Sequence, residues 1–368
     1  MVRRNTILFA VRYIGAIVVS DIMSFNSPTI DYTKAVVVIP ALNEAHTIEA
    51  ILRKLASEQV YIPNINIVVA DGGSTDGTKA IALSLSKQFD FVHVMDNPKK
   101  VQSAGVNMVA AAWRDKADVL VRCDAHAIYP DGFVLKLLKS LETTQAASVV
   151  IPMDSIGNSM VQTAIAWTAD SSVGSGGSAH RGGRKSGFVD HGHHAAFIMD
   201  KFLQLGGYDE TFSQNEDAEY DCRLRAQGEK IYLDANIRIK YMPRSTFLTL
   251  WRQYFGYGMG RSRTVLKHPT SLRVRQLAVP LHVVAIAVSI LLFSVFKMVF
   301  FLGWPIFYVL LLCLMSVRSM RKHRSSVGLL TGVAAFIMHT SWGLGFLTGL
   351  AVNIRALFSH PVAAAANA

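Results

Sequence analysis

The stretch VRCDAHAIYP places Asp124 and His126 at the end of an apolar run of residues. Carboxylate oxygens and imidazole nitrogens are ligands of divalent cations; Mn²⁺ tolerates imidazole well, whereas Mg²⁺ prefers oxygen. The two side chains could therefore hold a metal ion beside a phosphorylated substrate. The alternative is an ordinary strand end, at which His126 only packs or forms hydrogen bonds.

Carboxylates also stand at two earlier places where the sequence changes from apolar to polar. Glu44 ends the stretch VVVIPALNE, and Asp71 lies within VVADGGSTDGT. Carboxylate oxygens accept hydrogen bonds from ring N–H groups and ribose hydroxyls, so both residues are suited to bind a nucleotide. A dinucleotide site is the competing interpretation, but no G-x-G-x-x-G motif lies between a strand and a helix.

Apolar runs alternate with helical patterns from residue 34 onward. Because the runs have few polar interruptions, we expect an α/β fold with one open, mostly parallel sheet flanked by helices. Ligands of such sheets gather at the carboxyl ends of the strands, where Asn43, Glu44, Asp71 and Asp124 are expected. The expected strands are 34–40, 65–71, 91–95, 117–124 and 146–152, and the expected helices lie near 44–58, 76–88, 101–114 and 131–142.

The motifs VVVIPALNE and VVADGGSTDGT, in this order, resemble the nucleotide-binding half of the family 2 inverting glycosyltransferases. That family has the GT-A fold and uses nucleotide sugars as donors, and the likeness covers about residues 34–265. It implies that an early glutamate and the aspartate of the second strand bind the uracil and ribose of UDP. The UDP-binding residues implied here are Pro40, Ala41, Glu44, Asp71 and Gly72.

The same resemblance implies a metal ion at the fourth strand. Members of the family carry an aspartate-rich turn there, and CDAH matches its position, with Asp124 kept and His126 where many relatives have aspartate. A Mn²⁺ or Mg²⁺ ion at this turn would neutralise the diphosphate as UDP departs. The imidazole of His126 favours Mn²⁺.

A later stretch, GGYDETFSQNEDAEYDCRLRAQG, resembles the acceptor half of the family. An inverting transfer is a single displacement, so one carboxylate must take the proton from the attacking hydroxyl. The resemblance assigns this role to Asp217, with Glu216 or Asp209 orienting acceptor or donor hydroxyls. His193 and His194 are expected to line the acceptor cavity or to complete the metal shell. The alternative for the acidic residues of this stretch is that they only cap the helix and face solvent. A structural zinc site at the histidines is disfavoured because no cysteine lies at the spacing of zinc ligands.

Charge and hydropathy divide the chain into two parts. The 37 Lys and Arg exceed the 26 Asp and Glu, but no acidic residue follows Asp234, and the basic excess lies from Arg261 onward among apolar runs. Lipid therefore fits this charge better than nucleic acid does. The runs 277–296, 298–315 and 327–352 each approach or exceed the length of a transmembrane helix, with a buried helical bundle as the alternative.

Basic residues precede the first of these runs (261–275) and separate the second from the third (318–324), whereas only Lys297 lies between the first two. The positive-inside rule then places residues 1–275 in the cytoplasm and the C-terminus outside the inner membrane. We expect an apolar or amphipathic leader (1–33), a catalytic domain (34–265) and a membrane segment with about three transmembrane helices (266–368). The leader is interpreted as a surface helix or as the product of a misplaced start codon, since no clean signal-peptide cleavage site follows it.

Two basic segments adjoin the expected catalytic domain. The stretch WRQYFGYGMGRSR is expected to form an interfacial helix, or to bring Arg252 and Arg261 to a diphosphate, which is that of UDP or that of a lipid carrier. The stretch SSVGSGGSAHRGGRKSG is a flexible linker or a loop that closes over a phosphorylated substrate through Arg181, Arg184 and Lys185.

Within the family, RCDAHAIYP, QNEDAEYD and the short membrane segment resemble the membrane-attached glucosyltransferases of bacterial succinoglycan-type exopolysaccharide assembly. That likeness implies transfer of glucose from UDP-glucose to a polyprenyl-diphosphate-linked saccharide, with a β-1,3 linkage. The Q-x-x-R-W element of processive synthases is absent, which favours addition of one sugar per encounter. The alternatives are a transferase that glycosylates polyprenyl phosphate itself and a catalytically silent scaffold that binds nucleotide sugar.

Overall fold

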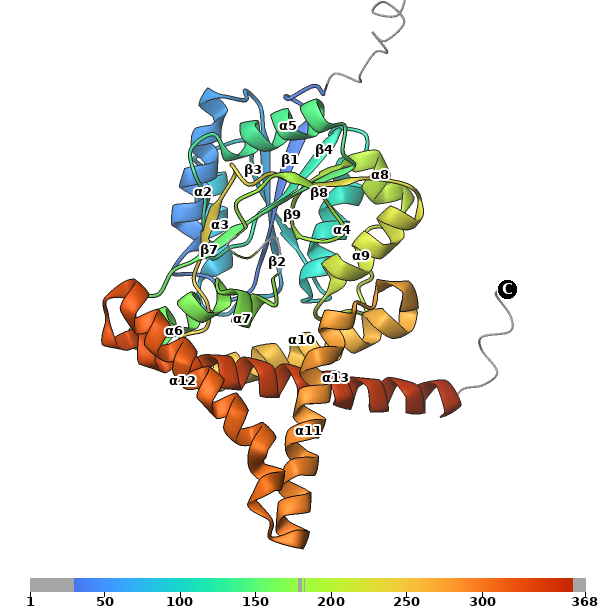
Figure 1. The fold of residues 1–368 in the computed structure, drawn as a ribbon. Helices are drawn as coiled ribbons and strands as arrows, with labels where there is room; N and C mark the ends of the chain where they lie inside the picture. Colours follow the sequence, from blue (N-terminus) through green and yellow to red (C-terminus); the bar gives the residue numbers. More distant parts are fainter. Residues whose placement is uncertain (1–29, 178–180, 182, 360–368) are drawn as a thin grey trace, which may run out of the picture.

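An eight-stranded sheet forms the centre of the computed structural model, which describes residues 30–177, 181 and 183–359 (Figure 1). The expected leader therefore lies, up to residue 29, outside the described residues. The strand order is β3-β2-β1-β4-β9-β6-β10-β8, and β1 to β4 pair in parallel. The strands are β1 (Ala35–Ala41), β2 (Asn66–Asp71), β3 (Val92–Asp96), β4 (Val119–Arg122), β6 (Ser148–Ile151), β8 (Gly187–Val189), β9 (His193–Ile198) and β10 (Ile231–Leu233).

Helices cover both faces of this sheet and bury its strands. Val37 and Ile39 of β1 pack into the core on one face, and Val36 and Val38 pack into the core on the other. Because both faces are dry, the strands are apolar throughout. One core includes residues of α2 (Ile48–Ala56), α3 (Thr78–Ser86) and α5 (Phe133–Thr144), and the other those of α4 (Gln102–Trp113), α8 (Met199–Gln204) and α9 (Glu216–Ala226).

The mostly parallel α/β sheet that the sequence predicts is thus confirmed, and each expected strand and helix of residues 34–152 has a counterpart. One boundary differs by several residues. Helix α2 begins at Ile48 rather than near residue 44, because Asn43 has a positive φ of 58° and a turn precedes the helix.

Two features of the sheets were not expected from the sequence. Strand β9 runs antiparallel between β4 and β6, so its first residue, His193, lies at the carboxyl end of β4. A second sheet has the order β5-β11-β7 and brings Tyr241 opposite Ala127. Its strands are too short to give a clear apolar pattern: β5 (Ala127–Ile128), β7 (Met153–Ser155) and β11 (Ile239–Tyr241).

The C-terminal helices lie below the sheet in Figure 1. Helices α11 (Val274–Phe296) and α12 (Gly303–His323) form a hairpin that extends away from the sheet, whereas α13 (Thr331–Ser359) crosses beneath it beside α10 (Phe247–Lys267). Three segments are long and apolar enough to cross a membrane, as the sequence predicts: Val274–Phe296, Val299–His323 and Ser326–Ile354.

Candidate active site

The loops that follow β1 and β2 are joined by hydrogen bonds at the carboxyl edge of the sheet. The Asn43 N–H donates to Ser74 Oγ at 2.9 Å, and Asn43 Oδ1 accepts from the Thr75 N–H at 2.9 Å. The Ala45 N–H donates to Asp76 Oδ2 at 3.0 Å. These contacts fix the two loops as one wall at the edge where ligands of parallel sheets bind.

Asp71 ends β2 within this wall and is 1% exposed. Its Oδ2 accepts from the N–H groups of Gly73 and Ser74 at 3.0 and 3.1 Å. Its Oδ1 is buried and has no hydrogen-bond partner among the described residues. Because an unsatisfied buried acceptor is destabilising, this oxygen is suited to a ligand N–H or hydroxyl.

The other residues expected to bind UDP lie along the same edge. The Gly72 N–H donates to the Ala41 carbonyl at 2.8 Å, and Pro40 precedes Ala41 on β1. Glu44 follows in the loop, where its N–H donates to Thr78 Oγ1 at 2.7 Å. The structure therefore brings the five expected residues together, while their role in UDP binding stays a prediction.

Asp124 follows β4, and its carboxylate lies between the side chains of His193 and Arg122. Its Oδ2 is 3.3 Å from His193 Nε2, and its Oδ1 is 3.6 Å from Arg122 Nε. Burial acts to raise the pKa of Asp124, but the charges of His193, Arg122 and His126 outweigh it and hold that pKa well below its usual range. The carboxylate is therefore ionised at neutral pH.

His126, the second expected metal ligand, contacts Glu44 instead. Its Nδ1 is 3.1 Å from Glu44 Oε1, and this hydrogen bond raises the pKa of His126 above its usual value. Its ring centroid lies 6.0 Å from that of Tyr241. Of the two imidazoles, that of His193 makes the direct contact with Asp124, which is consistent with the expectation that His193 completes the metal shell.

The side chains around Asp124 fit a divalent cation that is coordinated partly by the protein and partly by a bound nucleotide. Among the described residues, no group of three His, Cys, Asp or Glu side chains gathers as a complete metal site. Asp124 offers carboxylate oxygens, and His193 or His126 offers an imidazole nitrogen. Phosphate oxygens of a nucleotide would fill the remaining positions around Mn²⁺ or Mg²⁺.

Glu216 and Asp217 open helix α9. Glu216 Oε1 is 3.6 Å from Arg122 Nη1, and burial together with the charge of Asp217 raises the pKa of Glu216. Arg122 thus lies between Glu216 and Asp124 and joins α9 to the turn after β4. The two acidic motifs, separated by about ninety residues of sequence, share one guanidinium.

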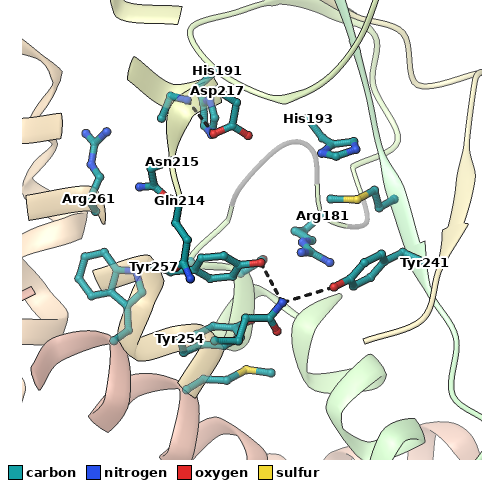
Figure 2. A pocket seen from close by; sticks show the side chains of 18 of the residues that line it. Arg181, His191, His193, Gln214, Asn215, Asp217, Tyr241, Tyr254, Tyr257 and Arg261 are labelled. Atoms are coloured by element: carbon teal, nitrogen blue, oxygen red, sulfur yellow. Dashed lines mark hydrogen bonds between the residues drawn. The ribbon is translucent and has the colours of Figure 1, made fainter. Parts of the chain in front are cut away.

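These side chains line a cavity of about 580 Å³ between the sheet and the C-terminal helices. His191 and Asp217 project into one end of it, and Tyr254 and Tyr257 of α10 line the other (Figure 2). The Gly/Ser-rich segment contributes Arg181. The expected site residues that line the cavity are Asp124, His126, His193, Glu216, Asp217 and Arg261.

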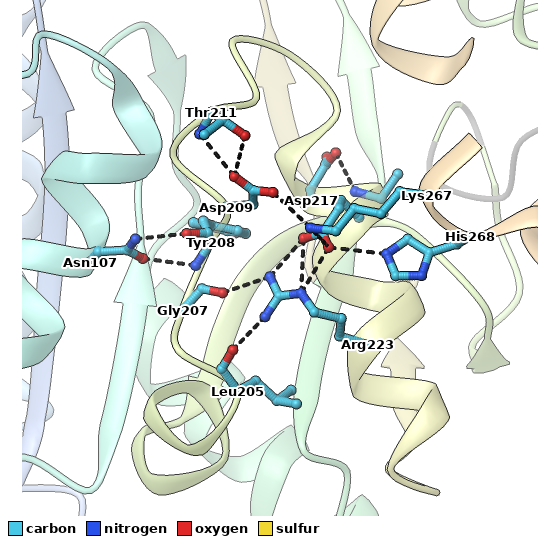
Figure 3. A network of polar contacts seen from close by, with 12 residues as sticks. Asn107, Leu205, Gly207, Tyr208, Asp209, Thr211, Asp217, Arg223, Lys267 and His268 are labelled. Atoms are coloured by element: carbon cyan, nitrogen blue, oxygen red, sulfur yellow. Dashed lines mark hydrogen bonds and ion pairs between the residues drawn. The ribbon is translucent and has the colours of Figure 1, made fainter. Parts of the chain in front are cut away.

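Asp209 lies outside this cavity, contrary to its expected place beside the sugar. Its Oδ2 accepts from Lys267 Nζ at 2.7 Å, and its Oδ1 accepts from the Thr211 N–H at 2.9 Å (Figure 3). Burial acts to raise the pKa of Asp209, but these contacts lower it to about 2. Its carboxylate therefore anchors the loop before α9 to the end of α10.

Other expected residues are also absent from the cavity wall. Arg252 is exposed on α10, because the wall is built from the opposite side of that helix, where Arg261 lies. Arg184 and Lys185 are likewise exposed and do not line it. The side chain of His194 lies outside the described part of the chain.

Arg122 is the residue at this site that the sequence interpretation missed. It is 6% exposed, and its Nη1 also donates to the Tyr208 hydroxyl at 3.1 Å. A signal was present, because arginine is the one charged residue in the strand VLVR, and a buried cation requires nearby anions. Tyr241 gave no such signal, since only the pairing of β11 with β5 brings it to the site.

The chain is similar in sequence to known glycosyltransferases. The family model of Glycosyl transferase family 2 matches residues 36–206. The succinoglycan biosynthesis protein ExoA of Rhizobium meliloti (strain 1021) is 41% identical over 322 residues, which cover 87% of this chain and 96% of that protein. The chain belongs to glycosyltransferase family 2.

This glycosyltransferase is also similar to an archaeal protein. The dolichyl N-acetyl-alpha-D-glucosaminyl phosphate 3-beta-D-2,3-diacetamido-2,3-dideoxy-beta-D-glucuronosyltransferase of Methanococcus voltae is 24% identical over 327 residues, 85% of this chain and 96% of that one. Among solved structures, the mannosyltransferase PcManGT from Pyrobaculum calidifontis in complex with GDP-Man and Mn²⁺ matches with a TM-score of 0.49 and 15% identity, over 84% of this chain and 88% of that chain. The glycosyltransferase has the GT-A-like architecture expected of its family, with a mostly parallel sheet and flanking helices.

Proposed function

We propose that this glycosyltransferase moves glucose from UDP-glucose to a polyprenyl-diphosphate-linked saccharide, with inversion and a β-1,3 linkage, in bacterial exopolysaccharide biosynthesis. The similarity to a succinoglycan biosynthesis protein supports the pathway class. The name of the Methanococcus relative specifies a lipid-linked sugar phosphate and a 3-beta linkage, which supports a lipid-linked acceptor and the linkage; the diphosphate is part of the proposal. The membrane-length helices support work at a membrane, and we place the catalytic part at the cytoplasmic face of the inner membrane because basic residues precede the first of these helices.

The observation that carries this proposal is that Asp124 and Asp217 line one cavity. UDP would lie along the wall formed by the loops after β1 and β2, with its diphosphate toward Asp124. Asp217, at the start of α9, would take the proton from the acceptor hydroxyl as that oxygen attacks the anomeric carbon. Glu216 and His193 would orient hydroxyl groups on either side, and the Arg122 guanidinium would hold Glu216 and Asp124 in place.

A divalent cation would be held by Asp124 with His193 or His126, and Mn²⁺ is favoured by the imidazole donors. When bound, the ion supplies positive charge that stabilises the departing diphosphate. Arg122 already places positive charge beside Asp124, so the protein contributes part of this stabilisation itself.

The proposal is tested by sugar transfer in membranes that contain the full chain. Labelled UDP-glucose and UDP-galactose are supplied with a glycosylated polyprenyl diphosphate or with bare polyprenyl phosphate, and the label extracted into organic solvent is counted. We expect label from UDP-glucose on the glycosylated diphosphate. Label on bare polyprenyl phosphate would indicate the alternative transferase, and absence of label with every donor would indicate a scaffold.

A further inference from the structure

The side of the cavity that faces the C-terminal helices is rich in arginine. In the part of the chain that the structure describes, none of these arginines has a carboxylate within 4.0 Å. Arg273, just outside the cavity, differs because it pairs with Asp190. The arginines on this side of the cavity come from four separate segments and are Arg181, Arg244, Arg261 and Arg275, whereas Arg122 lines the cavity beside Asp124 and Glu216.

The guanidinium of Arg261 lacks part of the hydrogen bonding that a buried cation requires. It is 9% exposed, and its Nη2 donates to the Ser271 carbonyl and, at 2.9 Å, to Gln276 Oε1. Its Nε is buried and has no hydrogen-bond partner among the described residues. A buried guanidinium without an anion is destabilising, so an anionic ligand would complete its environment.

Arg181 is held in place by aromatic side chains rather than by carboxylates. Its guanidinium carbon lies 5.2 Å from the centre of the Tyr241 ring. Gln253 of α10 donates to the Tyr257 hydroxyl at 3.0 Å and, more weakly, to the Tyr241 hydroxyl at 3.4 Å (Figure 2). A guanidinium fixed by a ring leaves its N–H groups available for the oxygens of a phosphate.

Apolar residues of the membrane-length helices complete this side of the cavity. Val279 of α11 and Met338 and Trp342 of α13 line it together with the arginines. Arg275, at the start of α11, donates to the carbonyls of Gly176 and Gly177 at 3.2 and 3.3 Å and so joins α11 to the Gly/Ser-rich segment. A ligand here would have an anionic group beside an apolar portion.

We propose that Arg181, Arg261 and Arg275 form a second anion site, which binds the diphosphate of the lipid-linked acceptor separately from the UDP site at Asp124. The inference rests on the proposed function, because it names the part of that acceptor which the arginines recognise. The lipid would leave along α11 and α13, and the saccharide would extend from the arginines toward Asp217. One cavity would then hold the acceptor diphosphate at its basic side and the acceptor hydroxyl at its acidic side.

The test measures binding of a diphosphate probe and needs no sugar transfer. The full chain is placed in phosphatidylcholine nanodiscs with saturating UDP and Mn²⁺, and binding of farnesyl diphosphate is titrated. Arg181→Gln and Arg275→Gln are each expected to raise the Kd at least about tenfold, because each removes charge-assisted hydrogen bonds. Thermal unfolding of each variant checks that it is folded.

Arg273→Gln is the matched control, since Arg273 lies two residues from Arg275, carries the same charge and pairs with Asp190 outside the cavity. We expect it to change the Kd by less than about threefold, as for a surface ion pair. The proposal is overturned if Arg273→Gln weakens binding as much as Arg275→Gln does, or if neither cavity variant weakens it.

Two further arms separate the possible sources of phosphate. If the binding of the probe that depends on the arginines appears only when UDP is left out, the arginines belong to the donor site. If phosphatidylglycerol displaces the probe equally well, the arginines bind ordinary headgroups; either result overturns the proposal. If the wild-type chain binds the probe through these arginines but transfers no sugar, the proposed function fails and the anion site stands. If it transfers sugar and the cavity variants bind the probe normally, only the anion site fails.

Discussion

At the scale of single residues, two carboxylates that lie beside the same guanidinium have pKa values shifted in opposite directions. Arg122 is 3.6 Å from both Asp124 and Glu216, yet the pKa of Asp124 is lowered and that of Glu216 is raised by burial and by Asp217. Environments that separate the pKa values of neighbouring acids allow them different roles. Asp124 is thereby kept as an anion, whereas the neutral form of Glu216 is favoured more than in an exposed glutamate.

Asp217→Asn tests the assignment of the general base. The amide cannot accept the acceptor proton as a carboxylate does, so we expect turnover to fall on the order of 10²- to 10⁴-fold. UDP affinity is expected to stay near that of the wild type, because the nucleotide wall does not include Asp217. Asp115→Asn, at an exposed aspartate that does not line the cavity, is the control. Turnover close to wild type in Asp217→Asn would show that the base is another residue.

Asp124→Asn tests the metal-binding role. UDP affinity is expected to fall on the order of tenfold or more in the presence of Mn²⁺ and to change little after chelation of the metal. The control is Asp118→Asn, because Asp118 lies just before β4 and Asp124 just after it, and Asp118 is exposed. Titration of labelled UDP with and without chelator measures the effect. An equal loss under both conditions would exclude a ligand role.

At the scale of elements, the orientation of α9 depends on a buried carboxylate two residues from Asp217. Glu219 is fully buried, and it contacts Arg223 at 2.9 Å, Lys267 at 2.8 Å and His268 at 3.1 Å (Figure 3). Burial acts to raise the pKa of Glu219, but the hydrogen bonds from Arg223, Lys267 and His268 outweigh it and lower that pKa. The carboxylate thereby connects α9 to the end of α10 and fixes the start of α9 against the cavity.

Glu219→Gln is therefore expected to lower both stability and turnover. Removal of one partner of a buried ion pair is destabilising by about 3 kcal/mol, and a shifted α9 would misplace Asp217. Glu49→Gln is a close control, because Glu49 and Arg53 have the same spacing in the sequence and the same 2.9 Å contact but are about half exposed. That change is expected to have an effect of about 0.5 kcal/mol or less. Chemical denaturation and transfer assays on both variants measure the difference; similar effects would contradict the anchoring role.

At the scale of the whole molecule, the three membrane-length segments are not equivalent. Within their most apolar windows, 6% of residues are buried in Val274–Phe296 and 11% in Val299–His323, against 44% in Ser326–Ile354. Helix α13 lies across the base of the catalytic domain, packed against α10, whereas the α11–α12 hairpin extends away from the domain (Figure 1). This arrangement favours a hairpin that crosses the bilayer and an α13 that lies at its surface. The C-terminal end would then be on the side of the catalytic domain, and not on the far side as the positive-inside rule with three crossings predicts.

Labelling of introduced cysteines tests this topology. In a background without the native cysteines, Phe300→Cys in the turn of the hairpin is expected to react with a membrane-impermeant maleimide in intact cells. Val352→Cys near the end of α13 is expected to react only after the membrane is permeabilised. Both positions are exposed in the protein, at 83% and 53%, so burial does not prevent the reaction. Labelling of both in intact cells would establish three crossings instead.

The sequence by itself determined the parallel part of the sheet and the position of its ligand edge, because strands buried on both faces must be apolar and the polar residues that follow them stand out. It likewise placed Glu44, Asp71, Asp124 and Asp217 as the residues to examine. Only the tertiary structure showed that Arg122 joins the motifs of Asp124 and Glu216, and that β9 returns antiparallel to bring His193 to Asp124. The tertiary structure also showed that Asp209 and Arg252 do not line the cavity. The physical reason is that apolar periodicity is a local property of the chain, whereas short strands, shared ion pairs and the orientation of α13 depend on contacts between distant segments.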